Sequence, residues 1–331
     1  KGAEFQNTEK PSVRIKNIKL NLKNIVIWFK NSIFIKNMLI VMSGTALAQI
    51  IGFALTPIIS RLFTPADFGI FGSFNAVSGV IAAGVTLEYS QAIMLPKEKR
   101  DAFDVLFISC IATLIISLLC ALICLVTPTY MMEIMNAPGR WVLALLVFTV
   151  LITGFNITMQ SWCVRVKAFK QTSASQVIRS VSSNAMQIGL GLFKTGSVGL
   201  VISSVLADLF ASINLLCVFW VDFKTSAHQI NWYRIKQLAR DYIDFPIYTA
   251  SGNVINALSM GLPVLLLANY FGIIVAGAFA FAERILSAPM GLVLRALRQV
   301  LFQKAAETDH HGGSLLALYI KVTAGLFALS V

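Results

Sequence analysis

Long apolar stretches separated by short polar breaks run through most of the chain. Several reach the roughly 18 residues that a helix needs to cross a hydrocarbon core, whereas barrel strands would be shorter and would alternate. The pattern predicts spans at about 38–60, 67–95, 103–127, 141–163, 175–193, 197–220, 246–271 and 272–302, with a ninth beginning near residue 314. The expected fold class is therefore an all-α polytopic membrane protein.

The amino-acid composition also indicates a membrane environment. Of the 331 residues, 57% are hydrophobic and only 13% are charged, and the mean hydropathy is +0.76. Soluble domains carry about 25% charged residues, so the bilayer is the expected environment. The five cysteines lie within apolar runs without a CxxC pair, and His310 and His311 lie in a hydrophilic stretch, so neither set predicts a metal site.

The net charge of +12 does not indicate nucleic acid, because the basic residues lie at the N-terminus and between apolar runs. They fall almost wholly on alternate breaks, which is the positive-inside pattern and predicts a cytoplasmic N-terminus. Residues 1–37 mix lysines with Ile, Trp and Phe, as a helix lying on anionic lipid does. Residues 221–245 have the same character and are interpreted as a cytoplasmic amphipathic linker.

This linker separates two segments that resemble copies of each other. The stretch PIISRLFTPADFGIFGSF has a counterpart in PVLLLANYFGIIVAGAFAF, and Gly69 then stands opposite Gly277 at an offset of 208 residues. We expect an N-lobe of six spans over 38–220 and a partial C-lobe over 246–331, related as parallel repeats with a binding site between them. The chain begins without methionine and stops inside an apolar run, so we expect a piece of a longer protein whose second lobe is incomplete.

Polar residues recur at helical spacing within the apolar spans. In lipid such side chains must face protein or water, so their angular position is the main functional signal. The stripes comprise Thr45, Gln49, Gly52 and Thr56; Thr153, Asn156 and Gln160; Arg179, Ser183 and Gln187; and Arg284, Ser287, Gly291, Arg295 and Arg298. Helix packing is the alternative for the neutral stripes, and snorkelling to the membrane surface is the alternative for arginines near span ends.

Arg284 is the basic residue that snorkelling explains least. It lies 14 residues from Arg298, or roughly 21 Å along the helix, and an ionised residue near the midplane is a functional hypothesis. Its neighbour Glu283 points about 100° away, so each charge is expected to meet another helix. Asp208 and Glu88 also lie within spans, as a partner for arginine, a proton carrier or a cation ligand.

Three stretches resemble a known family: GTALAQIIGFALTPIISRLFTPADFGIFGSF, WCVRVKAFKQTSASQVIRS and FAERILSAPMGLVLRALRQVLFQKAA. They are similar to polysaccharide biosynthesis proteins, the O-antigen-type lipid-linked oligosaccharide flippases of the multidrug/oligosaccharidyl-lipid/polysaccharide exporter superfamily. The resemblance implies a MATE-like two-lobe bundle that moves an undecaprenyl-diphosphate-linked oligosaccharide across the bacterial inner membrane by alternating access. Glu88 and Asp208 stand where that family more often has arginine and a neutral polar residue.

On this interpretation the protein is a transporter without a cofactor or bound metal, coupled in some family members to H⁺ or Na⁺. The expected cavity residues are Arg284, Arg295, Arg179, Gln187, Asn156 and Gln49. The residues expected to balance charge or bind the coupling ion are Asp208, Glu88 and Glu283. Expected partners are the lipid-linked oligosaccharide, membrane lipids, and polysaccharide polymerase and assembly proteins.

Two other functions compete with this one. A cation-coupled exporter of drugs or small molecules on the same fold would favour an acidic and aromatic cavity. A membrane glycosyl- or acyltransferase could use Asp241 and Asp244, which lie three residues apart, although neither a nucleotide loop nor a His/Asp motif accompanies them.

Overall fold

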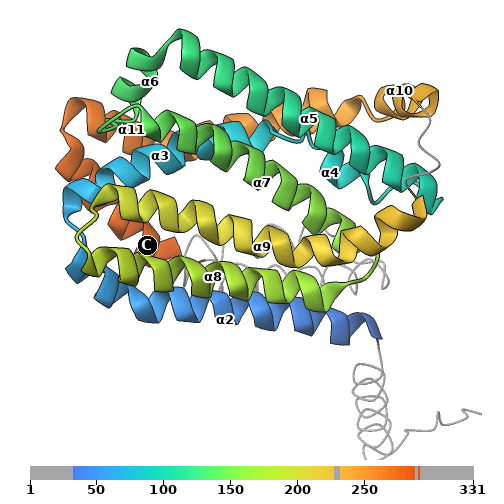
Figure 1. Ribbon diagram of the computed structural model, residues 1–331, viewed down its shortest axis with the longest axis horizontal. Helices are drawn as coiled ribbons and strands as arrows, with labels where there is room; N and C mark the ends of the chain where they lie inside the picture. The colour runs from blue at the N-terminus through green and yellow to red at the C-terminus, as the bar shows by residue number, and fades with distance from the viewer. Residues whose placement is uncertain (1–32, 227–231, 288–289, 291–331) are drawn as a thin grey trace, which may run out of the picture.

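The computed structural model describes residues 33–226, 232–287 and 290, and nearly all of them are helical (Figure 1). The named helices are α2 (Ile33–Leu62), α3 (Pro65–Gly84), α4 (Tyr89–Ala92), α5 (Lys99–Val126), α6 (Pro128–Ile134), α7 (Trp141–Arg165), α8 (Phe169–Leu192), α9 (Ser197–Ser226), α10 (Trp232–Asp241), η2 (Phe245–Ala250) and α11 (Ser251–Tyr270). A further helix covers 273–287. The N-terminal segment 1–32, Arg295 and the ninth span lie outside the described residues.

Six of these helices are long and apolar enough to cross a membrane. They are Ser43–Leu62, Pro65–Gly84, Lys99–Val126, Trp141–Arg165, Ser197–Trp220 and Phe245–Tyr270. The all-α polytopic fold class is thereby confirmed. Helix α8 forms where the fifth span was expected, but it is more polar than these six and is not among them; it packs between α2 and α9 (Figure 1).

The second span is shorter than the hydropathy pattern predicted. Thr64 and Asp67 form a capping box at its start, with N–O distances of 2.9 and 3.3 Å, and Pro65 occupies the first turn. The helix ends at Gly84 instead of continuing to 95, because Leu87 and Glu88 adopt positive φ angles of 48° and 58°. Val85 of this turn is buried and Leu87 is partly buried, so the hydropathy of the turn resembles that of a helix.

Helices α3 and 273–287 cross closely near their N-terminal ends, where glycines allow the backbones to meet. A Cβ on Gly277 would overlap the carbonyl oxygen of Pro65, and a Cβ on Gly69 would overlap that of Ile273. Both pairs of equivalent residues are 208 apart in number, so the contacts are reciprocal. Reciprocity of this kind is what a local two-fold relation between the two helices produces. The six-helix repeat and the lobe boundaries stay predictions.

An aromatic cluster holds together the end of the bundle where α5 begins and α7 ends. Phe103 of α5 packs edge-on against Trp162 of α7 at 5.6 Å and stacks on Phe219 of α9 at 6.1 Å. Ile235 of α10 joins the same core. Beyond α10, the seventh span opens with the π-helix η2, where Pro246 lacks the backbone donor that a regular turn uses.

Candidate binding cavity

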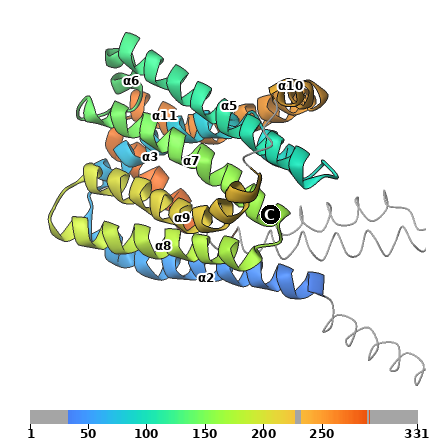
Figure 2. The ribbon, with the colours of Figure 1, turned by 45° about the vertical axis from the view of Figure 1, so that its right-hand side comes forward.

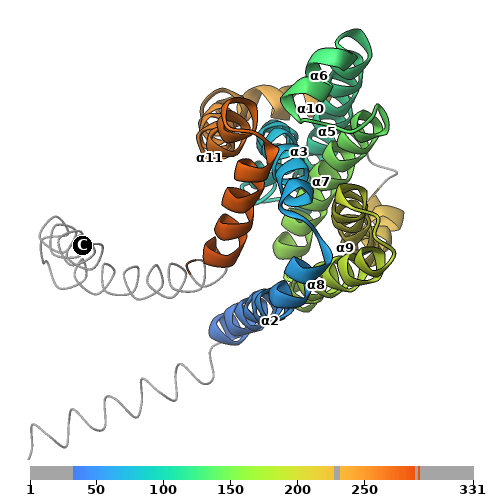
Figure 3. The same cartoon turned by 90° about the vertical axis from the view of Figure 1, so that its left-hand side faces the viewer.

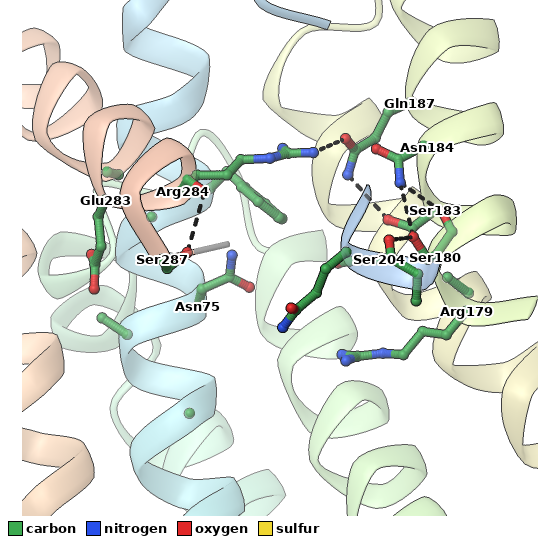
Figure 4. A pocket seen from close by; sticks show the side chains of 18 of the residues that line it. Asn75, Arg179, Ser180, Ser183, Asn184, Gln187, Ser204, Glu283, Arg284 and Ser287 are labelled. Atoms are coloured by element: carbon green, nitrogen blue, oxygen red, sulfur yellow. Dashed lines mark hydrogen bonds between the residues drawn. The ribbon is translucent and has the colours of Figure 1, made fainter. Parts of the chain in front are cut away.

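A cavity of about 920 Å³ lies between two groups of helices. Residues of α2, α7, α8 and α9 line one wall, residues of α11 and helix 273–287 line the other, and α3 lies between them (Figures 3 and 4). Uncharged polar side chains make up much of the lining. The amides are Gln49, Asn75, Gln160, Gln176, Asn184 and Gln187, and the hydroxyls are Thr45, Ser175, Ser180, Ser183, Ser204 and Ser287. The charged lining residues among those described are Arg179, Glu283 and Arg284.

Arg284 reaches across the cavity from one wall to the other. Its Nη2 donates a hydrogen bond of 2.8 Å to Oε1 of Gln187 on α8, and Gln187 in turn donates to Ser183 at 3.2 Å (Figure 4). Glu283 points away from Arg284, as their adjacent positions predicted. Within the described part of the chain no carboxylate lies within ion-pair distance of Arg284, so its charge is met there by an amide dipole.

Arg179 has a different partner. Its Nε and Nη2 donate to the two carboxylate oxygens of Asp208 on α9, the second at 3.2 Å. Asp208 is only 7% exposed, whereas the Arg179 side chain is 58% exposed to the cavity side. The sequence placed Arg179 among substrate ligands and Asp208 among charge-balancing residues; the structure joins them as one ion pair with no net charge.

Two amide oxygens in the cavity wall lack a donor. The Oε1 of Gln49 on α2 and the Oδ1 of Asn184 on α8 are buried, and neither finds a hydrogen-bond partner among the described residues. Asn184 uses its amide nitrogen on the Ser180 carbonyl at 2.7 Å. Buried polar atoms are normally satisfied, so these acceptors are suited to a donor supplied from outside the protein.

Asn156 does not line the cavity. It is 6% exposed, its Nδ2 donates to Ser212 at 2.9 Å, and its Oδ1 accepts from Gln160. Gln160, one turn further along α7, lies in the cavity wall instead. The stripe therefore points in the expected direction, but α9 packs over Asn156 and separates it from the cavity.

Glu88 also lies away from the cavity lining. Its two carboxylate oxygens accept from Asn253 of α11 at 2.9 Å and from Gln91 at 2.7 Å. The helix break after Gly84 places Glu88 between α4 and α11. The hydropathy pattern predicted a continuous second span and therefore did not predict this position. Of the three carboxylates proposed from the sequence, Glu283 lines the cavity, Asp208 lies behind Arg179, and Glu88 joins α4 to α11.

Several cavity residues were absent from the sequence interpretation. Gln176, Ser180 and Asn184 form a second polar row on α8 beside the expected row of Arg179, Ser183 and Gln187. The low hydropathy of this helix was the signal that could have found them. Asn75 lies between Phe74 and Ala76 on α3, a helix of higher hydropathy than α8, and offers a weaker signal.

The helices and cavity define a multi-pass membrane protein with a polar chamber between two helix groups. Residues 58–331 match the family model described as "Polysaccharide biosynthesis protein", and the chain belongs to that family. It is also 24% identical over 284 residues to the succinoglycan biosynthesis transport protein ExoT of Rhizobium meliloti (strain 1021). That alignment covers 83% of this chain and 55% of the relative, so the chain spans about half the relative's length. No solved structure matches the chain.

Proposed function

We propose that this protein is a flippase for a lipid-linked oligosaccharide, acting in the biosynthesis of a bacterial surface polysaccharide such as O-antigen or capsule. Its substrate is an undecaprenyl-diphosphate-linked oligosaccharide, moved across the inner membrane by alternating access. The observation that carries the proposal is a cavity lined by neutral amides and hydroxyls and crossed by one arginine that meets no carboxylate among the described residues.

The neutral lining suits the sugar part of such a substrate. Sugar hydroxyls both donate and accept, and the cavity offers amides and hydroxyls on the wall of α2, α7, α8 and α9, an amide on α3 and the Ser287 hydroxyl on the opposite wall. The unpartnered oxygens of Gln49 and Asn184 would each accept from a sugar hydroxyl. A volume of about 920 Å³ lies at the upper end of the range for ligand pockets, large enough for a few sugar rings.

Arg284 suits the diphosphate. Guanidinium binds phosphate oxygens through paired donors, and a charge-assisted bond to phosphate is stronger than one to a neutral amide. A diphosphate would therefore replace Gln187 as the partner of Arg284. Because this hydrogen bond joins the two walls, its exchange for a ligand contact would also release them, which couples substrate binding to a change of state.

The coupling ion, if the transport cycle uses H⁺ or Na⁺, is assigned to Glu283. Asp208 already has Arg179 as its counter-ion, and Glu88 is held by two amides outside the cavity lining. Glu283 lies in the lining and is accessible. Because Asp208 already neutralises Arg179 and Glu283 points away from Arg284, the Arg284 guanidinium keeps a charge that an anionic ligand can meet.

The competing functions fit the site less well. An exporter of organic cations would place carboxylates in the cavity, whereas two arginines and a single glutamate line it within the described residues. A surface transferase would use Asp241 and Asp244, which end α10 and precede η2 away from the cavity lining. Cytoplasmic orientation of the N-terminus remains part of the proposal and is testable by reporter fusions at the helix ends.

Complementation tests the proposal directly. The full-length protein, its Arg284→Ala variant and an Arg140→Ala control are expressed in a strain that lacks an oligosaccharide flippase. Arg140 precedes α7, is exposed and lies outside the cavity lining, so its loss removes the same charge without touching the site. We expect surface polysaccharide with the wild type and the control, and none with Arg284→Ala at equal membrane levels. Failure of the wild type to restore polysaccharide in a strain with matched sugars would overturn the proposal.

A further inference from the structure

Helix α10 lies outside the cavity and runs across the bundle. In Figure 2 it is seen almost along its axis, while α5, α7, α8 and α9 are seen from the side. It packs on α5 at the end of the bundle where α5 begins (Figure 1). If the spanning helices cross the membrane, α10 lies close to the plane of its surface.

One face of α10 is fixed to the protein. Ile235 is 6% exposed in the aromatic core, and the Tyr89 hydroxyl donates to the carbonyl of Ala239 at 2.9 Å. Arg234 pairs with Asp101 at 2.5 Å and with Glu98 at 3.4 Å. These contacts set the rotation of the helix and commit the Arg234 charge to the protein.

The adjoining face is exposed. At 100° per residue, Trp232, Lys236 and Arg240 fall at 0°, 40° and 80°, and Tyr233 falls at 100°. All four are exposed, Trp232 by 69% and Tyr233 by 81%. The acidic residue of the helix, Asp241, lies at 180°, on the far flank. This sector therefore combines two amphipathic aromatic rings with two positive charges.

This combination matches a lipid headgroup layer better than water or a protein partner. Trp and Tyr concentrate at membrane interfaces because the ring is apolar and its N–H or O–H is polar. Lysine and arginine are attracted by the negative surface potential of an anionic leaflet. An acidic protein partner could pair with Lys236 and Arg240. It would not explain why Trp232 and Tyr233 lie beside these charges on a helix parallel to the membrane.

We propose that the face formed by Trp232, Tyr233, Lys236 and Arg240 binds anionic phospholipid headgroups. Because α10 joins α9 to the seventh span, this contact holds the linker between the two helix groups at the membrane surface. The proposal stands independently of what the cavity transports.

Fluorescence quenching in nanodiscs tests it. The full-length protein is placed in an equimolar mixture of phosphatidylglycerol and phosphatidylcholine, with a spin label near the headgroup on one lipid or on the other. The Trp232 signal is the difference between each protein and its Trp232→Phe counterpart. We expect labelled phosphatidylglycerol to quench Trp232 at least about twofold more than labelled phosphatidylcholine, with the excess falling at 1 M salt.

The charge dependence is tested with paired substitutions. Lys236→Gln with Arg240→Gln should bring the two lipids to equal quenching, whereas Arg61→Gln with Arg140→Gln at the other end of the bundle should keep the wild-type preference. Equal quenching in the wild type would overturn the proposal, since the charges would then not recruit anionic lipid. Absence of quenching by either lipid would also overturn it, since Trp232 would then lie outside the headgroup layer.

Discussion

The two arginines of the cavity differ in what holds them. Arg179 lies on α8 with its guanidinium against Asp208 of the neighbouring α9, so its charge is neutralised within one wall. Arg284 extends from helix 273–287 to a neutral amide on the opposite wall. An arginine paired within its own wall stabilises that wall, whereas one bound to an amide keeps a net charge that a ligand can use.

The comparison also shows why counting basic residues overstates the charge of a membrane cavity. In the sequence, Arg179, Arg284 and Arg295 form one basic series. In the structure, the first is cancelled by Asp208, the second is not, and the third lies outside the described residues. The excess charge that can attract the proposed diphosphate therefore depends on whether a neighbouring helix supplies a carboxylate to each arginine.

The largest effect is expected at the paired arginine. Arg179→Leu leaves the buried Asp208 carboxylate without a counter-ion, which costs about 3 kcal/mol because that charge is buried even though Arg179 is half-exposed. We expect the melting temperature of the purified protein in nanodiscs to fall by about 5 °C or more. Thermal unfolding followed by fluorescence provides the measurement.

The matched variants show whether the pair itself is responsible. Asp208→Asn should cost less, because the half-exposed Arg179 can turn its charge toward the cavity. Asp208→Asn combined with Arg179→Leu should recover part of the loss, since no ion is then left unpaired. If the loss of stability in the double variant equals the sum of the losses in the two single variants, Arg179 and Asp208 act independently. The distinction drawn between Arg179 and Arg284 would then fail.

The position of Arg284 depends on the glycine crossing two turns before it. Gly277→Ala places a methyl group against the Pro65 carbonyl, where backbone cannot yield easily, at a cost of about 2 kcal/mol. We expect lower thermal stability together with reduced complementation, because helix 273–287 would be pushed away from α3. Gly252→Ala is the control, since nothing lies within 4 Å of its added methyl group. Equal stability of both variants would show that the crossing does not set the position of Arg284.

The sequence predicted most of the fold, because transmembrane spans are long and their apolar composition is demanded by lipid. It missed the break after Gly84, since a buried turn and a buried helix have the same hydropathy. For the cavity, helical spacing indicated the faces of Gln49, Arg179, Gln187 and Arg284; these residues lie in the lining, and their role in binding stays a prediction. Periodicity gives direction around one helix only, so it could not show that α9 covers Asn156 or that Asp208 neutralises Arg179.

A substitution at Gln187 separates the effect of the Arg284 charge from the effect of its hydrogen bond across the cavity. Gln187→Glu keeps the reach of the side chain but converts the hydrogen bond into an ion pair, giving Arg284 the same kind of partner as Arg179. We expect thermal stability to be unchanged or higher and transport to fall about tenfold, because a carboxylate competes with the diphosphate. Complementation and the amount of surface polysaccharide measure the fall. Gln187→Met, which removes the bond without adding charge, should retain more activity; the reverse order would show that the contact matters and the net charge does not.

The smallest effect is expected at Glu88, although the sequence placed it beside Glu283 and Asp208. Its oxygens accept from Asn253 and Gln91 outside the cavity lining, so its charge neither faces the substrate path nor offsets Arg284. Glu88→Gln retains one acceptor oxygen and should leave complementation within about twofold of the wild type. Glu283→Gln, the same chemical change within the lining, should alter transport more strongly, because it removes a carboxylate that lines the proposed substrate path. Should Glu88→Gln impair transport as much as Glu283→Gln, the charge that matters would lie at the break after α3 and not in the cavity.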